Sequence, residues 1–153
     1  MGTTYKELAD SVFDKIKSYD FLDMTEDEAY NVVFTYIRPS IVRFENCRQD
    51  LSDRDDTVAA FNITLTDDTF EILVRYMVVE WLESNYIFVW DALQEQLSSS
   101  SFKKVNTKDM LTRTTALRDQ MLRECKQLSI NKAFKKTATD LYDIATGSKS
   151  DLE

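Results

Sequence analysis

Apolar residues begin to recur at helical spacing close to the start of the chain. Thr4, followed three residues later by Glu7, forms a capping box, in which each side chain bonds the backbone amide of the other at the start of a helix. From Tyr5 to Ile16 the apolar residues then follow at spacings of three and four, which keeps them on one helical face. The pattern predicts an amphipathic helix over this range.

A second capping box, Thr25 with Glu28, precedes another apolar face, which runs over residues 29–37. Pro39 interrupts this pattern, and apolar residues resume directly after it. Proline removes an amide donor and clashes with the preceding turn. The sequence therefore predicts either a kinked helix or two abutting helices, with the break near Arg38.

The stretch from Arg48 to Asp68 changes character, because aspartates outnumber basic residues in it and no helical period is sustained. We expect an acidic connecting loop here. Phe61, Ile63 and Leu65 alternate with polar residues, which is the pattern of a short extended segment at the edge of the core. Thr66 then offers an N-cap for the next helix.

Residues 70–82 are apolar nearly all the way round a helix, so this helix is expected in the middle of a bundle or at a contact between subunits. Ser84 is expected to cap a further helix, which carries Ile87, Trp90, Leu93 and Leu97. The serine run at 98–101 ends that helix, because serine side chains compete with the backbone for hydrogen bonds.

The longest helix is predicted to begin at Thr107, because apolar residues from Met110 to Leu128 fall within an arc of about 140° at about 100° per residue. From Ile130 onward the pattern predicts one more short amphipathic helix, with a polar end after Gly147. The predicted fold is all-α, a small bundle of about five to six helices with an acidic connecting loop. It divides into a helical domain over residues 1–129 and a C-terminal helical extension over residues 130–153.

The composition limits the possible functions of the chain more than it limits the possible folds. The chain has 153 residues, 43% of them apolar and 30% charged, which suits one domain with a substantial core. It contains no histidine, so the commonest general base, the Ser-His and Cys-His nucleophile pairs and imidazole metal ligands are missing. Its two glycines, Gly2 and Gly147, are too few for a P-loop or a G-x-G-x-x-G turn. We therefore expect a protein that is not an enzyme and takes no cofactor.

Cys47 and Cys125 are too few for a disulfide framework, and neither has a histidine or a second cysteine nearby in the sequence. Both are expected to be small buried residues. No charged, apolar-cored leader opens the chain, and no apolar run approaches the length of about 18 residues that a membrane span needs. We expect a soluble protein that is made in the cytoplasm and has no membrane partner.

Charge is divided along the chain, whose formal net charge is −8. Residues 1–100 carry 20 acidic and 8 basic side chains, whereas residues 101–137 carry 3 acidic and 10 basic side chains. Such segregation favours a subunit that presents opposite potentials to different neighbours, because complementary patches steer association. The alternative is that the long helix is simply solvated by its basic residues while it packs on an acidic bundle.

One acidic cluster resembles a cation site but lacks the full set of ligands that such a site needs. Asp53, Asp55 and Asp56 are grouped like the ligands of a calcium loop, but Val58 stands where such a loop needs glycine and Thr64 where it needs glutamate. A solvated or partner-facing loop is the better interpretation, and no metal site is predicted.

A basic cluster surrounds Phe134 in the C-terminal extension, and such clusters contact phosphates in other proteins. In an acidic chain, docking onto an acidic protein surface is the better functional interpretation, and a solvated helix end is the alternative. A separate aromatic cluster, more typical of a core, is kept as an interface candidate. The basic residues are Lys132, Lys135 and Lys136, and the aromatic ones are Tyr86, Phe88 and Trp90.

Three stretches together resemble one family. The first covers residues 29–44 and contains Tyr-Ile-Arg-Pro at 36–39. The second is Phe-Asn-Ile-Thr-Leu-Thr-Asp-Asp at 61–68, which leads into the apolar helix, and the third is the continuation through 93–102 into the long helix. They span most of residues 5–130 and resemble the head–tail connector, or neck adaptor, proteins of tailed bacteriophages of Gram-positive hosts.

The resemblance implies a small subunit that forms a ring with copies of itself, twelvefold, between the portal protein of the capsid and the next neck or tail-completion protein. Genomic DNA passes through the lumen without sequence-specific binding, and the location is the virion neck. In such adaptors the C-terminal helix commonly grips the portal, which makes Lys132, Phe134, Lys135, Lys136, Leu141, Tyr142 and Ile144 candidate portal contacts. Candidate contacts to neighbouring subunits are Asp50, Asp53, Asp55, Asp56, Tyr86, Phe88 and Trp90.

The rival hypothesis is a non-enzymatic acidic helical binding module, an adaptor or inhibitor of a basic partner that could imitate nucleic acid. A nucleic-acid mimic spreads its carboxylates over one continuous face. Here they gather in the first helix, at the start of the second and in one loop, interleaved with a basic helix. That distribution weighs against a nucleic-acid mimic.

Overall fold

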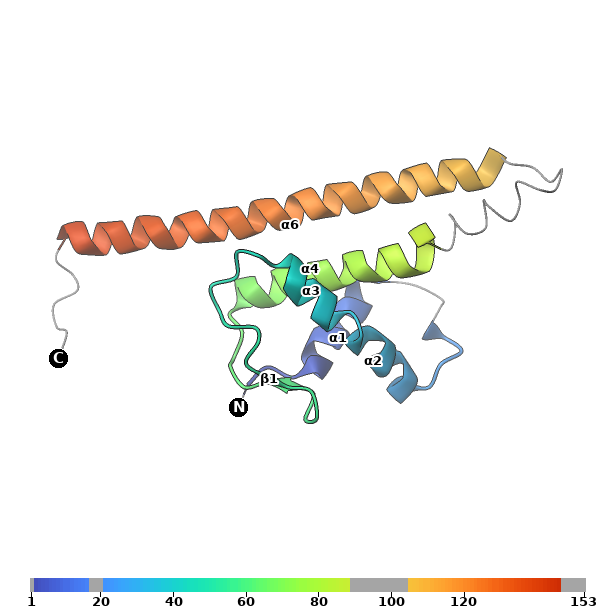
Figure 1. Cartoon of the computed structure of the whole chain (residues 1–153), viewed down its shortest axis with the longest axis horizontal. Coiled ribbons are helices and arrows are strands. Elements are labelled where there is room, and N and C mark those ends of the chain that lie inside the picture. Colours follow the sequence, from blue (N-terminus) through green and yellow to red (C-terminus); the bar gives the residue numbers. More distant parts are fainter. Residues whose placement is uncertain (1, 17–20, 89–104, 147–153) are drawn as a thin grey trace.

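Helices make up most of the part of the chain that the computed structural model describes, which is residues 2–16, 21–88 and 105–146 (Figure 1). Within the last range, the side chains of residues 105–107, 136, 143, 144 and 146 lie outside the description. The elements are α1 (Tyr5–Lys15), α2 (Glu26–Phe34), α3 (Ile37–Arg43), β1 (Arg54–Asp55), β2 (Ala60–Phe61), α4 (Asp67–Leu82), the π-helical turn η2 (Glu83–Ile87) and α6 (Val105–Thr146). The prediction of a mostly helical protein is confirmed, and the small hairpin β1–β2 is the departure from an all-α fold.

Both predicted capping boxes are present. Thr4 Oγ1 accepts a hydrogen bond from the Glu7 amide at 3.3 Å, while Glu7 Oε2 accepts one from the Thr4 amide at 2.7 Å. Thr25 and Glu28 repeat this arrangement at the start of α2. These bonds satisfy amides that the first turn of a helix leaves unpaired, so they fix where α1 and α2 begin.

α2 and α3 are two abutting helices. The break falls at Thr35 and Tyr36, slightly ahead of the predicted position at Arg38. Pro39 lies in the first turn of α3, where an amide has no intrahelical partner to lose. The proline therefore sits inside the second helix instead of kinking a single long one.

The acidic connection between α3 and α4 contains an antiparallel hairpin, which the sequence predicted only as a loop with a short extended segment. β1 pairs with β2, so that Arg54 lies opposite Phe61. Ala59 precedes β2 with a φ of 54°, a left-handed conformation that turns the chain back. Its carbonyl accepts a hydrogen bond from the Tyr5 amide at 2.8 Å, which ties the hairpin to the start of α1.

The N-terminal residues run alongside this hairpin. The Phe61 amide donates to the Thr3 carbonyl at 2.8 Å, and the Thr3 amide donates to the Ile63 carbonyl at 3.0 Å. A Cβ atom on Gly2 would lie 1.7 Å from the Phe61 carbonyl oxygen, so only glycine fits there without a shift of the backbone.

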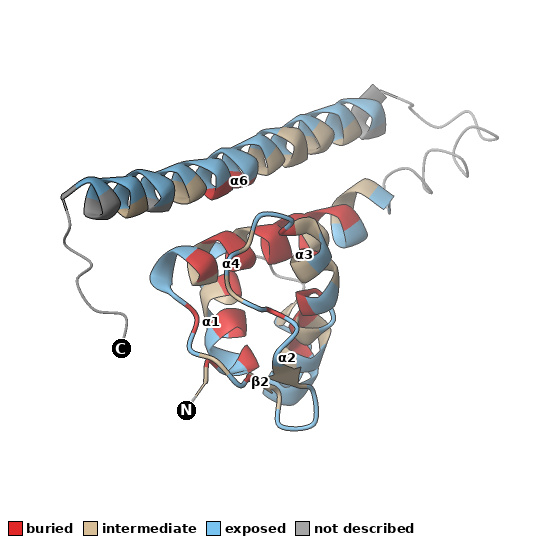
Figure 2. Ribbon diagram, turned by 60° about the vertical axis from the view of Figure 1, so that its left-hand side comes forward, coloured by how far each residue is buried: buried red, intermediate tan, exposed pale blue. Residues whose placement is uncertain are grey.

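α4 is the centre of the fold, as its all-round apolar sequence predicts. Ten of its 16 residues are buried, and α1, α3 and α6 all contact it. Leu8 and Val12 on α1 are fully buried against this core, and Phe61 closes its far side in edge-to-face contact with Tyr5. Figure 2 shows the buried residues gathered around α4.

α6 is one continuous helix of 42 residues, about 63 Å long at about 1.5 Å per residue. The prediction of a separate short helix after Ile130 is therefore wrong. We call the described part of residues 2–88 the body. α6 runs antiparallel to α4 along one side of the body, and both of its ends extend past it (Figure 1).

The predicted helix start at Ser84 is also wrong. The backbone stays in the right-handed helical region from Leu82 to Phe88, so Ser84 lacks the extended conformation of an N-cap and α4 passes directly into η2. The predicted continuation through Trp90, Leu93 and Leu97 and the serine run at 98–101 lie outside the described residues.

No helix in the described ranges is long and apolar enough to cross a membrane.

Candidate interaction surface

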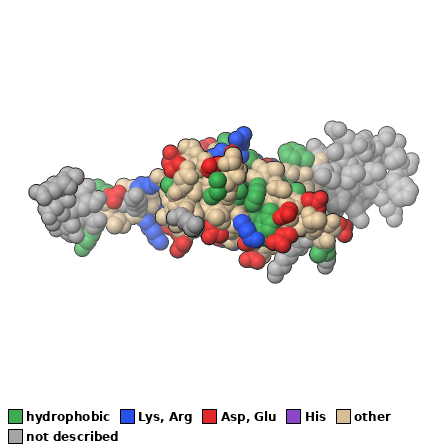
Figure 3. All heavy atoms as spheres, turned by 90° about the horizontal axis from the view of Figure 1, so that it is seen from below, with side chains coloured by type: hydrophobic (Ala, Val, Ile, Leu, Met, Phe, Trp, Pro, Cys, Tyr) green, Lys and Arg blue, Asp and Glu red, His purple; other side chains and the backbone are tan. Residues whose placement is uncertain are grey.

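The hairpin and the N-terminus lie on the side of the body opposite α6 (Figure 1). Seen from this side, red acidic side chains are scattered over the body and blue basic ones are few (Figure 3). The acidic hairpin and the basic helix, which the sequence predicted as separate contact regions, therefore face in different directions.

The aspartates of the hairpin region mostly bond to the loop itself. Asp50 Oδ1 accepts from the Ser52 amide at 2.9 Å, and Asp55 Oδ1 accepts from the Thr57 amide at 2.8 Å. The Ser52 and Thr57 hydroxyls donate to these same oxygens, and the hydroxyl bonds, followed by the amide bonds, hold the pKa values of both carboxyls below their usual range. Asp53 Oδ1 accepts from the Asn62 side chain at 2.7 Å. These candidate neighbour contacts shape the hairpin, whether or not they also meet a partner.

Asp56 joins the hairpin to the first helix. Its Oδ1 accepts a hydrogen bond of 2.6 Å from the Tyr5 hydroxyl and an ion-pair contact of 3.3 Å from Arg54. The Tyr5 bond lowers the pKa of Asp56, and burial followed by this same bond raises the pKa of Tyr5 above its usual range. Arg38 approaches the other oxygen at 3.7 Å.

The aromatic candidates lie at the other end of the body, after α4. Tyr86 is partly buried and packs edge-to-face on Trp81, with ring centroids 5.0 Å apart. Phe88 is 63% exposed. Trp90 lies outside the described residues. Of the two described members of this cluster, Phe88 is the more accessible.

α6 is fastened to the body by polar side chains along the full length of α4. Arg118 donates to Glu83 at 3.2 Å, at the end of α4. Lys132 donates to the Thr66 hydroxyl at 3.1 Å and also to Thr69, at the start of α4. Lys132, predicted as a portal contact, is therefore engaged inside the chain.

A further contact comes from the loop after α3. Arg48 Nη2 donates to the Ala133 carbonyl at 3.1 Å and to the Thr137 hydroxyl at 3.0 Å. Beyond this contact the last turns of α6 project from the body (Figure 1).

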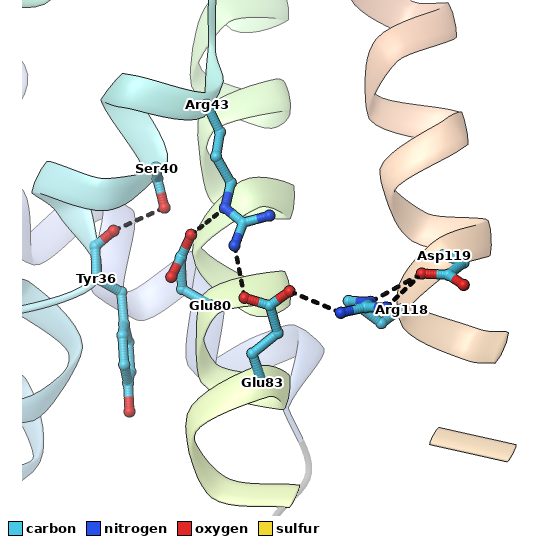
Figure 4. A network of polar contacts seen from close by, with 7 residues as sticks. All are labelled: Tyr36, Ser40, Arg43, Glu80, Glu83, Arg118 and Asp119. Atoms are coloured by element: carbon cyan, nitrogen blue, oxygen red, sulfur yellow. Dashed lines mark hydrogen bonds and ion pairs between the residues drawn. The ribbon is translucent and has the colours of Figure 1, made fainter. Parts of the chain in front are cut away.

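The contact at Glu83 belongs to a network that crosses three helices (Figure 4). Arg43 on α3 pairs with Glu80 and, at 2.5 Å, with Glu83, whose other oxygen meets Arg118 of α6. Arg118 also pairs with Asp119 at 2.8 Å. The glutamate side chains are only 12% and 11% exposed, so water screens these charges less than it screens pairs on an open surface.

The apolar contact between α6 and α4 is narrow. Cys125 is fully buried, while Met121 and Leu122 are partly buried against the core. Of the predicted apolar arc, Met110, Leu117 and Leu128 remain 46%, 49% and 38% exposed. Two buried polar atoms have no hydrogen-bond partner in the described part: Trp81 Nε1 and Ser129 Oγ. Hydrogen bonds and ion pairs therefore contribute a large share of the contact between α6 and the body.

The two cysteines differ in burial. Cys125 is buried as predicted, and burial raises the pKa of its thiol to about 11. Cys47 is only half-buried and lies in the loop after α3. The prediction of two buried cysteines is confirmed for Cys125 alone.

Past residue 129 the apolar residues of α6 change face. At about 100° per residue, Ile130, Phe134 and Leu141 lie between about 100° and 180° around the helix from Cys125 and Ser129. They are 40%, 71% and 62% exposed. With the exposed Ala138 between them they form what we call the outer stripe, on the side of α6 that faces away from the body (Figure 2). This change of face explains why the sequence pattern ends at residue 129 although the helix does not.

The other predicted portal contacts lie around this stripe. Tyr142 is 69% exposed beside Leu141. Lys135 is exposed and lines a groove of about 360 Å³ between α6 and the start of α4, which also contains Lys132 and Asp68. Lys136 and Ile144 lie on α6, and their side chains are outside the description. Ile130 and Ala138 were not among the predicted contacts. Their spacing of four residues from Phe134 is the signal in the sequence that could have identified them.

Fold and surface together define a class: a mostly helical protein with a long helical arm that carries exposed apolar and basic side chains. Among the described residues, no group of three or more acidic or cysteine side chains is placed to hold a metal ion. Comparison with models of protein families, with curated proteins and with solved structures finds no match for this chain.

Proposed function

We propose that this chain is a structural subunit of the neck of a tailed phage, a head–tail connector without catalytic activity or cofactor. It docks on the portal protein through the end of α6 and forms a ring with copies of itself, twelvefold by the resemblance. The ring meets the next neck or tail-completion protein on its other side, and genomic DNA passes through its lumen without sequence-specific binding. The protein is made in the host cytoplasm and resides in the virion.

The outer stripe is the observation that carries this proposal. Phe134 and Leu141 are among the most exposed large apolar side chains of the described chain, and they lie on a helix that needs neither for its own packing. Spacings of four and three along a helix are the signature of a helix that docks into an apolar groove. Exposed apolar patches of this kind mark protein contacts.

The arrangement of charge supports ring assembly. A head-to-tail ring requires two different faces on each subunit that complement each other. The acidic hairpin side and the basic helix side lie on opposite sides of the body, as such a ring needs. The rival acidic binding module is less well supported, because Asp50, Asp55 and Asp56 are already hydrogen-bonded within the body.

The test is to mix the purified chain with a cognate portal ring, measure the mass of the complex and image it. We expect a ring of copies on the portal. Phe134→Asp is expected to abolish binding, because it places a charge in the apolar groove that the stripe fills.

Val42→Asp is the matched control, since Val42 is 74% exposed and belongs to α3, outside the outer stripe. It should bind the portal like the wild type. A wild-type protein that ignores the portal and captures a basic protein would transfer the proposal to the binding module, and equal loss in both variants would show that the stripe is not the docking surface.

A further inference from the structure

We propose that, before it meets any other partner, the outer stripe of α6 pairs with the same stripe of a second copy, and that the two helices run antiparallel. This inference concerns the free protein and does not require the proposed function. It does share the stripe with the proposed portal contact, so the two contacts exclude each other.

The position of the stripe leaves room for such a pair. Ile130, Phe134 and Leu141 lie on the far side of α6 from Cys125, the residue that packs on α4. Two copies that meet along this face therefore keep their bodies on the outside, with both helices between them. Arg118 and Lys132, which bond the body, lie off this face, whereas Arg48 of the body bonds Thr137 at its edge.

The spacing of the stripe suits pairing with another helix. Ile130, Phe134, Thr137 and Leu141 alternate at four, three and four residues, which is the heptad spacing of a coiled-coil seam. Ala138 beside the seam is small and lets the helix axes approach. When Ile130 of one copy lies opposite Phe134 of the other, the two-fold symmetry of the pair repeats the same contact.

Charge selects the antiparallel direction. Lys126 and Asp140 lie on the same edge of the seam, fourteen residues or about 21 Å apart, and neither has an ion-pair partner within the described chain. In a parallel pair this edge of one helix meets the opposite edge of the other, so Lys126 and Asp140 have no charged partner across the seam. In the antiparallel register above, Lys126 of one copy and Asp140 of the other differ by only about 3 Å in their position along the helix axis. The two-fold symmetry of the pair makes this contact twice.

The length of the seam sets the strength of the pair. About two heptads bury much less surface than the roughly 1,600 Å² of a standard stable interface. We therefore expect a dimer that forms in the micromolar to millimolar range and gives way to a partner with a deeper groove. Such a dimer covers the apolar arm while the protein is free.

Sedimentation velocity of the full chain, from micromolar to millimolar concentration, tests this inference. The wild type is expected to shift from monomer to dimer. Lys126→Asp and Asp140→Lys should each weaken the dimer about tenfold, since each makes two like-charge contacts, and the double variant should recover it. A parallel pair would show no such recovery.

Lys108→Asp is the matched control, because Lys108 is an exposed lysine on the same face of α6, five turns before Lys126 and outside the seam. It changes the net charge equally and should leave the dimer unchanged. A wild type that stays monomeric to millimolar concentration, or a dimer that survives Phe134→Asp, overturns the inference. A monomer that still binds the portal overturns the self-pairing alone, whereas a dimer that ignores the portal overturns the proposed function alone.

Discussion

Replacing Glu83 by glutamine is expected to weaken both the body and its contact with α6. The Glu83 carboxylate faces Arg43 at 2.5 Å and Arg118 at 3.2 Å. Glutamine keeps the volume and one acceptor oxygen but removes the charge. A hydrogen bond to a charged group contributes about 1.5 to 3 kcal/mol, and both arginines retain some contact with water, so we expect the free energy of unfolding to fall by about 2 kcal/mol.

Two assays separate the local from the global effect. Urea denaturation gives the free energy of unfolding. Labelling of Cys125 in native buffer, in a Cys47→Ala background, reports how often α6 lifts from α4, because the Cys125 thiol is buried and its pKa is raised to about 11. About half of the loss, roughly 1 kcal/mol, concerns the Arg118 contact, so labelling should accelerate about fivefold.

Glu124→Gln is the matched control. Glu124 is 48% exposed on α6 and meets Arg75 at 3.7 Å, so its loss should change the free energy of unfolding by less than about 0.5 kcal/mol. If the two substitutions had equal effects, or if Glu83→Gln left the labelling rate of Cys125 unchanged, the network would not fasten α6 as we argue.

Three further predictions concern the body. Gly2→Ala should cost about 1 to 3 kcal/mol in urea denaturation, because its Cβ would meet the Phe61 carbonyl. Thr25→Ala should cost about 1 kcal/mol in the same assay, since it removes the cap of α2. On acidification, the unfolded chain takes up protons first, because the Thr57 bonds hold the pKa of Asp55 below 3.8 in the folded state. Stability present above about pH 4 should therefore fall as the pH drops further, and Asp55→Asn should flatten that fall in a titration followed by circular dichroism.

Local signals in the sequence were sufficient for much of the body. The capping boxes at Thr4 and Thr25 lie within four residues of chain, so neighbouring structure hardly affects them. α4 was predictable because a helix that is apolar all round has to be buried. The hairpin was not, since it depends on Thr3 and Gly2, whose partners lie far along the chain.

The error at Ile130 has a different origin. The residues around it, such as Lys132 and Ala133, are good helix formers, and no glycine or proline interrupts them. The backbone therefore continues while the apolar pattern changes face. The sequence suggested a boundary at residue 129 because the apolar pattern changes there, but a change of pattern is not a change of backbone. The hydrogen bond from Lys132 to Thr66 could not be predicted from the sequence either, because it depends on how α6 packs on the body.

The two parts of α6 differ in what their apolar side chains contact. Before residue 130 the apolar side of α6 stabilises the protein's own fold, and after it the apolar side is open to solvent. A substitution in the outer stripe, such as Phe134→Asp, should therefore remove partner binding with little change in the free energy of unfolding, because that side chain is 71% exposed in the free chain. Exposed apolar side chains raise the risk of aggregation without stabilising the fold, which is why we attribute this stripe to a partner. Since α6 is continuous between its two faces, a partner seated on the stripe is held rigidly with respect to the body, which the proposed role as a connector requires.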